Sequence, residues 1–152
     1  MRLVIQRVTE AEVTIDGVCH GRIGRGVVVL VGFGEGDTEA RLGKVIDKLV
    51  GLRLFADEAG NTNLALADVQ GGILLVSQFT LYADIRKGRR PSFTRSLEPE
   101  AAKALYAKFV ARVREVYSSG PVESGVFGAM MQVRLVNDGP VTIWLDSDEI
   151  GA

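Results

Sequence analysis

A short apolar run that ends abruptly in polar residues is the feature that most constrains how this chain can fold. Residues 73–76 (ILLV) follow a pair of glycines, and such a short aliphatic run bounded by turn residues is typical of a buried strand. Ser77, Gln78 and Thr80 then place two hydroxyls and a carboxamide at the strand end. A buried polar group destabilises the fold unless it finds a partner. The sequence therefore predicts either local hydrogen bonding or a binding site at this strand end.

Apolar patterns elsewhere predict strands and two helices, in the order strands, helix, strands, helix, strands. Asp16-Gly17 is a strong hairpin signal, because a type I′ turn needs positive φ angles. Tight turns of this kind imply mostly antiparallel pairing, which indicates an α+β domain or a partly closed barrel covered by helices. The expected strands cover residues 3–8, 13–15, 27–33, 52–55, 73–76, 130–136 and 141–145.

Both expected helices carry one apolar face, as a helix packed on a sheet requires. The first is expected to be capped by Asp37 or Thr38 and to run to about residue 50. The second is expected to be capped by Ser96 and broken by residues 118–121. The predicted buried faces are Leu42, Val45, Ile46, Leu49 and Val50 in the first helix, and Ala102, Leu105, Tyr106, Phe109, Val113, Val116 and Tyr117 in the second.

The length of 152 residues is that of one domain, which we place at residues 1–145, followed by an acidic tail at 146–152 that is expected to fray. The formal net charge of −1 excludes a general basic field, so a nucleic-acid contact must come from a local patch. Cys19 is the single cysteine, which excludes an intrachain disulfide and fits a reducing compartment. No apolar run approaches the roughly 20 residues that cross a bilayer, and the first residues resemble a strand rather than a signal peptide.

His20 is the only histidine, which restricts the side-chain chemistry open to the chain. Cys19 and His20 are neighbours in an expected strand and would point to opposite faces, so we expect no metal site and no cofactor. A Ser-His-Asp triad would need His20 beside Ser77, and the chain has no G-x-S-x-G elbow. Ser77 and Thr80 would face opposite sides of an extended strand, so without a turn there at most one could act as a nucleophile.

Gly32, Gly34 and Gly36 stand at the end of the expected central strand. Their spacing, G-x-G-x-G, matches neither the dinucleotide fingerprint nor the phosphate-binding P-loop, and no Lys-Ser or Lys-Thr pair follows. The segment is therefore expected to be a flexible loop rather than a cradle for phosphate.

The only dense basic segment follows the polar strand end and contains Arg86, Lys87, Arg89 and Arg90. For a charge run considered alone, a solvated loop is the more frequent interpretation. Its position after the polar strand end, and before an aromatic residue, also fits a loop that contacts the phosphates of a flexible nucleic-acid end.

Gly139-Pro140 lies between the last two expected strands and is expected to form a tight turn. An X-Pro bond adopts the cis form at a small free-energy cost, and a cis bond would redirect both carbonyl groups. Rigid carbonyls could accept hydrogen bonds from a ligand ammonium without the help of any side chain.

Two segments together resemble the signature motifs of the D-aminoacyl-tRNA deacylases, also called D-tyrosyl-tRNA deacylases: residues 77–81 (SQFTL) and 137–142 (NDGPVT). Residues 5–8 (IQRV), 90–93 (RPSF) and 131–133 (MQV) are similar to the family as well. The resemblance runs from the start of the chain to about residue 145. The pair of motifs at this separation is specific, whereas either motif alone would be weak.

The resemblance implies a homodimeric cytoplasmic hydrolase that acts in translation quality control. The implied reaction is hydrolysis of the ester between a D-amino acid, or mischarged glycine, and the 3′-terminal adenosine of tRNA. The implied fold is α+β: a small, mostly antiparallel β-barrel-like sheet with helices packed on the outside, in agreement with the strand and helix order. The implied partners are aminoacyl-tRNA and a second copy of the chain, with no cofactor, metal or membrane.

The resemblance also implies roles for individual residues that bind substrate. The Gly139-Pro140 bond would be cis and would reach into the other subunit's site, where its carbonyls hold the amino group and its bulk rejects an L side chain. Arg7 is similar to the family arginine that braces this loop. Phe127 stands where the family has an aromatic residue near the terminal adenine, and Met131 belongs to the same substrate-binding set.

Catalysis is assigned to Ser77, Gln78, Phe79 and Thr80, where backbone N–H groups around Phe79 and Thr80 would form an oxyanion hole. The vicinal ribose hydroxyl of the substrate would orient or activate water. Two alternatives stay open: a hydrolase of small esters with Thr80 or Ser77 as nucleophile, and a non-enzymatic nucleic-acid-binding module. The residues assigned to tRNA binding are Arg86, Lys87, Arg89 and Arg90.

Overall fold

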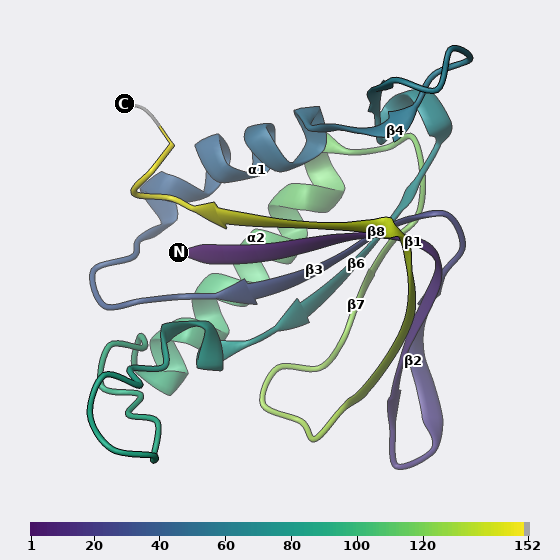
Figure 1. Ribbon diagram of the computed structural model, residues 1–152. Coiled ribbons are helices and arrows are strands. Elements are labelled where there is room, and N and C mark those ends of the chain that lie inside the picture. Colours follow the sequence, from purple (N-terminus) through teal and green to yellow (C-terminus); the bar gives the residue numbers. More distant parts are fainter. Residues whose placement is uncertain (151–152) are drawn as a thin grey trace.

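A computed structural model describes residues 1–150 as one sheet covered by two long helices, with a small second hairpin (Figure 1). The helices are α1 (Leu42–Gly51) and α2 (Pro99–Val116), and short 3-10 turns occupy Glu39–Arg41 (η1), Ala67–Val69 (η2) and Phe79–Tyr82 (η3). The strands are β1 (Arg2–Ile15), β2 (Val18–Ile23), β3 (Gly26–Gly32), β4 (Arg53–Ala56), β5 (Thr62–Ala65), β6 (Gly72–Ser77), β7 (Val122–Ser124) and β8 (Gln132–Asp146).

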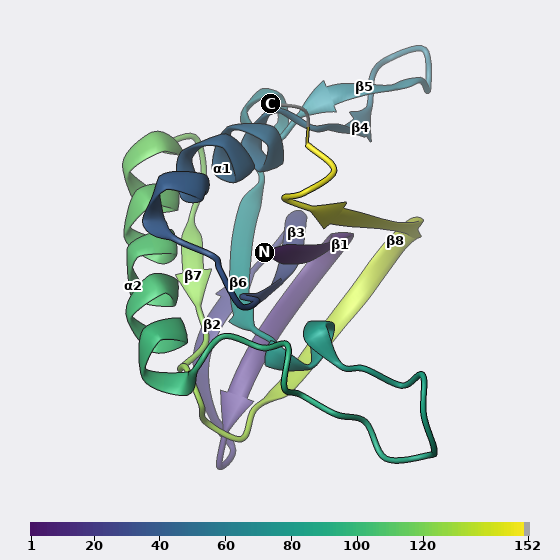
Figure 2. The same ribbon diagram turned by 90° about the vertical axis from the view of Figure 1, so that its left-hand side faces the viewer.

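The long strand β1 organises the sheet. It pairs antiparallel with β3 over its first half and with β2 over its second half, while β8 pairs antiparallel along its other edge. Next to β3, the strands β6 and β7 continue the sheet in parallel. The sheet curves until it nearly closes, and both helices cover one outer side (Figure 2). The expected α+β, barrel-like fold with outer helices is therefore confirmed, with antiparallel pairing around β1 and parallel pairing from β3 through β6 to β7.

Two apolar clusters hold the layers together. The larger one lies between the sheet and the helices and includes Phe109 and Ile46, both fully buried. The smaller one fills the curve of the sheet and includes Val13 and Leu74. The predicted helix faces are largely confirmed, with one exchange: Val116, the last residue of α2, is exposed, and Val110 is buried instead.

Neither helix is capped as expected. The carboxylate of Asp37 is buried and accepts hydrogen bonds from the Met1 amino group and the Gly34 N–H, both at 2.7 Å, so it is not free to cap α1. The Thr38 side chain makes no capping bond either. Glu98 caps α2 by accepting from two backbone N–H groups, which lowers the pKa of its carboxyl. The Ser96 hydroxyl instead donates to the Phe79 carbonyl at 3.2 Å.

The expected turn at Gly139-Pro140 does not reverse the chain. The two strands predicted around it are one strand, β8, interrupted by a bulge. Val8 pairs with Asn137 and Gln6 with Thr142, so residues 138–141 stand opposite Arg7 alone. This extra length pushes a four-residue segment, here called the Gly-Pro bulge (residues 138–141), out of the ladder.

The first residues after β8 are anchored rather than frayed. The Ser147 N–H donates to the Met1 carbonyl at 2.8 Å, and the Asp148 carboxylate accepts from Arg41 at 2.6 Å. The expectation of a frayed tail is therefore wrong up to residue 150, and residues 151–152 lie outside the described part. Among residues 1–150, neither helix combines the length and apolarity that crossing a bilayer would require.

Candidate functional site at the end of β6

The polar residues after β6 fold into a single 3-10 turn, η3, rather than continuing the strand. Ser77 ends β6, and the Gln78 N–H donates to the Val31 carbonyl of β3 at 2.7 Å. The side chain of Gln78 then donates to the Thr80 hydroxyl. The extended backbone that would place Ser77 and Thr80 on opposite sides is therefore absent, because η3 begins two residues after Ser77.

The first two amides of η3 are free. The first N–H groups of any helical turn lack an intrahelical acceptor, because the acceptor carbonyl would precede the turn. Within residues 1–150, the N–H groups of Phe79 and Thr80 make no other hydrogen bond either. Phe79 is 56% exposed and Thr80 is exposed as well, so the turn that carries these amides lies at the surface.

Gly32 and Gly34 form the seat on which η3 rests. A Cβ atom on Gly32 would lie 2.6 Å from the Gln78 carbonyl oxygen, and one on Gly34 would lie 2.3 Å from the Tyr82 ring. Real Cβ atoms do not approach other atoms so closely, so both positions need glycine for close approach. The flexible loop expected here is in fact a packed surface, which sequence reasoning missed because the spacing matched no known motif.

A basic loop leaves η3 and returns to pack on it. Backbone bonds between Asp84 and Ser92, at 2.7 and 2.9 Å, close the loop, and Gly88 has a φ of +67° within it. Beyond the closure, the Phe93 ring meets the Phe79 ring edge-on at 4.9 Å between centroids. The loop protrudes from the body of the molecule in both views (Figures 1 and 2).

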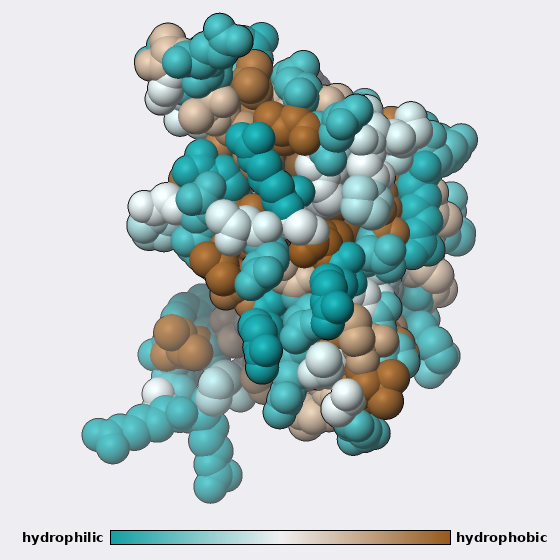
Figure 3. Space-filling model, turned by 90° about the vertical axis from the view of Figure 1, so that its right-hand side faces the viewer, coloured by the Kyte–Doolittle hydropathy of each residue, from teal (hydrophilic) through white to brown (hydrophobic). Residues whose placement is uncertain are grey.

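The charges of this loop are not equivalent. Arg86 binds the carboxylate of Asp84 through its Nε at 2.9 Å, and these hydrogen bonds hold the pKa of Asp84 well below its usual range. Lys87, Arg89 and Arg90 are exposed and make no ion pair within the described chain. Figure 3 shows the protruding segment with long hydrophilic side chains that extend into solvent.

The Gly-Pro bulge is held from beneath by Arg7. Its Nε donates to the Asp138 carbonyl at 3.1 Å and its Nη1 donates to the Leu54 carbonyl of β4 at 2.6 Å. Asn137 closes the bulge, because its side-chain oxygen accepts from the Val141 N–H at 3.1 Å. The Gly139-Pro140 bond is cis, and both residues are exposed.

Within one chain the structure does not bring η3 and the Gly-Pro bulge together. Ser77 pairs with Val31 and Arg7 pairs with Val27, so the two motifs flank β3 four residues apart, or about 13 Å at the usual strand rise. Figure 1 shows the corner of β8 and the turn η3 at opposite sides of the sheet. A site that contained both would need a second copy of the chain.

Comparison with known proteins decides the family. The family model described as D-Tyr-tRNA(Tyr) deacylase matches residues 4–146. The chain belongs to this deacylase family. It is 55% identical over 149 residues to a protein of Desulfitobacterium hafniense named D-aminoacyl-tRNA deacylase, a match that covers 98% of this chain and 99% of the relative.

Two solved structures share the fold of this chain. The chain is similar to the c-Myc DNA Unwinding Element Binding Protein, with a TM-score of 0.91 and 42% identity over 96% of this chain and 98% of the other. A probable eukaryotic D-amino acid tRNA deacylase shares the fold, with a TM-score of 0.80 and 22% identity over 95% and 97% of the two chains. The family resemblance inferred from the sequence is confirmed.

Two further deacylase-motif candidates lie between β7 and β8. Because β7 runs parallel to β6, with Ser124 beside Leu75, the chain that follows it heads toward the sheet end that carries η3. Phe127 is half-buried there and packs against the Tyr106 ring at 5.9 Å. Met131 is half-buried against the smaller apolar cluster. Their roles in substrate binding stay predictions.

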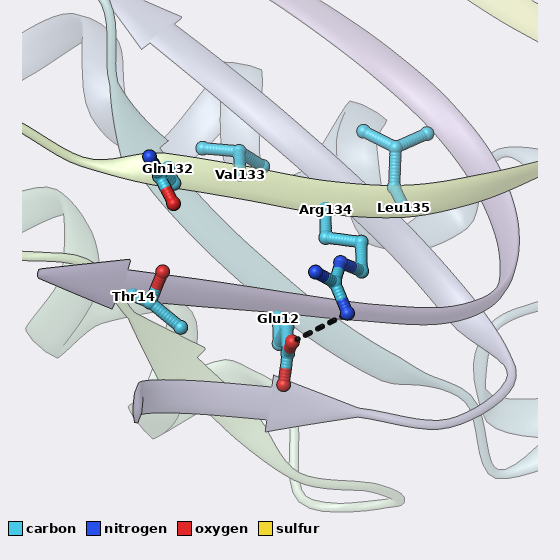
Figure 4. A pocket seen from close by; sticks show the side chains of 6 residues that line it. All are labelled: Glu12, Thr14, Gln132, Val133, Arg134 and Leu135. Carbon is cyan, nitrogen blue, oxygen red and sulfur yellow. Dashed lines mark ion pairs between the residues drawn. The ribbon is translucent and has the colours of Figure 1, made fainter. Parts of the chain in front are cut away.

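A shallow hollow of about 450 Å³ on the β1–β8 ladder contains none of the predicted site residues (Figure 4). Glu12 lies at its centre, 2.6 Å from Arg22 and 3.6 Å from Arg134. The hydrogen bond from Arg22 lowers the pKa of Glu12. These are cross-strand ion pairs on a solvated sheet face. The residues that line the hollow are Glu12, Thr14, Gln132, Val133, Arg134 and Leu135.

Proposed function

We propose that this chain hydrolyses the ester bond of D-aminoacyl-tRNA and releases the free D-amino acid and tRNA. Membership of the deacylase family supports this activity. The observation that carries the proposal is the exposed turn η3, whose Phe79 and Thr80 amides have no partner among residues 1–150. N–H donors without a partner are what the oxyanion of ester hydrolysis requires.

In the proposed reaction, water attacks the ester carbonyl carbon and the carbonyl oxygen becomes an oxyanion bound by the two amides. The bond to the 3′ oxygen of the ribose then breaks, and that oxygen leaves with a proton from the attacking water. The vicinal ribose hydroxyl orients the water. The Thr80 hydroxyl already accepts a hydrogen bond from Gln78, and neither Ser77 nor Thr80 contacts a histidine or carboxylate in the described chain. Main-chain catalysis therefore fits η3 better than a side-chain nucleophile.

Chiral selection is assigned to the Gly-Pro bulge of a second copy. Since the bulge lies about 13 Å along β3 from the turn of its own chain, it fits the site of a partner in a homodimer. Its exposed carbonyls would accept from the substrate amino group. The exposed Gly139-Pro140 segment would face the chiral centre of the substrate on the side from which an L side chain projects. An L side chain would be excluded there, whereas glycine would pass.

The tRNA end would lie across η3 and the basic loop. Lys87, Arg89 and Arg90 are exposed and would contact phosphates. Arg86 would contribute less to phosphate binding, because it forms an ion pair with Asp84. Phe127 would stack on the terminal adenine, with Met131 beside it in the substrate-binding set and Arg7 bracing the bulge. A substrate of this kind places the enzyme in the cytoplasm.

A hydrolysis assay with matched substrates tests the proposal. Purified protein is mixed with D-tyrosyl-tRNA, L-tyrosyl-tRNA, glycyl-tRNA and an aryl ester, and the free amino acid or alcohol is measured. We expect release from the D-form and from glycyl-tRNA, and none above background from the L-form. Equal release from both tyrosyl-tRNAs, or none from the D-form, would contradict the proposal.

The same assay separates the alternatives. A hydrolase of small esters would cleave the aryl ester and show no preference between the two tyrosyl-tRNAs. A nucleic-acid-binding module would release nothing from any substrate and would still bind tRNA. The second alternative is kept because the similar solved structure is named for DNA binding, and because the basic loop is exposed.

A further inference from the structure

We infer that Arg2 is a positioning residue for the reaction, because it clamps the turn η3 onto the sheet. The inference rests on the proposed function, in which η3 supplies the oxyanion donors. Nothing in the sequence patterns singles out this residue, which is simply the first residue of β1. Its importance follows from what its side chain touches.

The guanidinium of Arg2 joins three separate parts of the chain. Its Nη1 donates to the Leu81 carbonyl, inside η3, at 2.8 Å. Its Nε donates to the Asp146 carboxylate, at the end of β8, at 3.0 Å. The plane of the group lies over the ring of Tyr82, the last residue of η3, with Cζ at 4.4 Å from the centroid. Trp144 lies on the same group at 5.3 Å.

The ion pair between Arg2 and Asp146 is largely shielded from solvent. The side chains of Arg2 and Asp146 are 19% and 12% exposed, so solvent screens their interaction less than that of a surface pair. The guanidinium matches two acceptors and two aromatic faces at once, which an ammonium group cannot do. The contact therefore depends on arginine and not only on a positive charge.

Arg2 and the glycine seat hold η3 from different directions. In the sheet, Arg2 pairs with Gly32, whose missing side chain makes room for Gln78 and Leu81. Gly34 makes room for the Tyr82 ring, and the Arg2 guanidinium lies against that ring. Since η3 is a single turn, movement at Leu81 and Tyr82 displaces the free amides of Phe79 and Thr80 as well.

The test compares Arg2→Met and Arg2→Lys with the wild type in steady-state hydrolysis of D-tyrosyl-tRNA. A small displacement of the oxyanion donors weakens their hydrogen bonds to the transition state. We therefore expect kcat to fall about 10- to 100-fold in Arg2→Met. The KM should change little, because the basic loop and the bulge are untouched. Arg2→Lys keeps the positive charge but lacks the planar guanidinium, so its kcat should lie between those of the wild type and Arg2→Met.

Arg22→Met is the matched control, because it also removes an arginine of an ion pair with a carboxylate, 2.6 Å away, but far from η3. Trp144 gives a second readout, since it is the only tryptophan and lies on the clamp. Its fluorescence emission should shift in Arg2→Met and stay unchanged in Arg22→Met. Circular dichroism at the assay temperature shows whether each variant is folded.

The inference is overturned if folded Arg2→Met keeps the wild-type kcat, or if Arg22→Met loses as much. If Arg2→Met does not fold, Arg2→Lys decides, and a wild-type kcat in that variant overturns the inference equally. A wild-type protein that releases no D-tyrosine overturns the proposed function instead, and the positioning role falls with it. If the wild type is active and the Arg2 variants have the same kcat, the proposed function stands and only the positioning role of Arg2 is overturned.

Discussion

Thr80 accepts a hydrogen bond from Gln78 and donates to no base within residues 1–150, although its hydroxyl stands where a nucleophile would be expected. A threonine hydroxyl is a weak nucleophile unless a neighbouring base takes its proton. The main-chain amides of Phe79 and Thr80 are the groups at this turn that remain free. At the scale of single residues, the proposed reaction would therefore depend on backbone N–H groups, which every substitution except proline leaves in place.

A proline at position 79 can remove one of these amides. Proline has no N–H and is tolerated at the first position of a helical turn, so we expect Phe79→Pro to fold. Loss of one oxyanion donor should lower kcat about 100- to 1000-fold in hydrolysis of D-tyrosyl-tRNA.

Two control variants separate the amide from the side chains. Phe79→Ala removes the same ring and its edge contact with Phe93 but keeps the N–H. It should lose much less activity than Phe79→Pro. Thr80→Ala should retain turnover within about tenfold of the wild type, whereas a loss as severe as that of Phe79→Pro would favour a Thr80 nucleophile.

At the scale of elements, the basic loop (residues 84–92) is a structural unit of its own that follows η3 in the chain. It is closed by the Asp84–Ser92 bonds, and its free charges are Lys87, Arg89 and Arg90, since Arg86 is held by Asp84. A closed loop fixes where its charges stand relative to the turn. The loop should therefore contribute to binding of the tRNA end and not to the chemical step.

We expect the triple variant Lys87→Ala, Arg89→Ala, Arg90→Ala to raise KM for D-tyrosyl-tRNA and leave kcat nearly unchanged. A plot of log affinity against log salt concentration has a negative slope, and each lost phosphate contact on a single strand makes it shallower by about 0.7. The loss of three contacts should therefore make the slope shallower by about 2. Lys103→Ala, an exposed lysine of α2, is the control. An unchanged salt slope in the triple variant would show that the loop does not contact the RNA backbone.

At the scale of the whole molecule, the two motifs stand at opposite ends of β3, and the proposed homodimer would unite η3 of one copy with the Gly-Pro bulge of the other. Each site would take η3 from one subunit and the Gly-Pro bulge from the other. Subunits with different defects should then complement one another.

The complementation experiment mixes Phe79→Pro with Gly139→Ala, each inactive alone, under conditions that exchange subunits. Gly139→Ala places a methyl group at a position with positive φ, 3.0 Å from Arg7 and from Val141, and should abolish substrate binding. A mixed dimer contains one site with an intact turn and an intact bulge, so activity should reappear. Sedimentation that gives only a monomer, or mixtures that stay inactive, would contradict the cross-subunit site.

Local signals in the sequence determined most of the fold. The period of the apolar residues located both helices, and continuous apolar runs located the buried strands β3 and β6. The turn residues Asp16-Gly17, both with positive φ, located the first hairpin. These predictions succeeded because periodic burial and turn chemistry depend on neighbouring residues. The pair of motifs determined the family in the same way, because a motif is a local string of residues.

The errors occurred where a residue has a distant partner. Asp37 resembles a helix cap, but it pairs with the Met1 amino group, 36 residues away. Gly139-Pro140 resembles a hairpin turn, but the neighbouring strand β1 continues past it and turns the segment into a bulge. In both cases the residues make a contact that forms only on folding, in place of the local structure that their neighbours in the sequence favour.

The site shows the same division. The sequence by itself singled out the residues of η3 and of the Gly-Pro bulge as site candidates, because their types are unusual at a strand end and between strands. Only the tertiary structure decided that the amides of η3 are free, that Gly32 and Gly34 are its seat, and that Arg2 clamps it from β1. The physical reason is that a backbone donor, a close approach and a guanidinium clamp are properties of distances between segments, which residue order does not record.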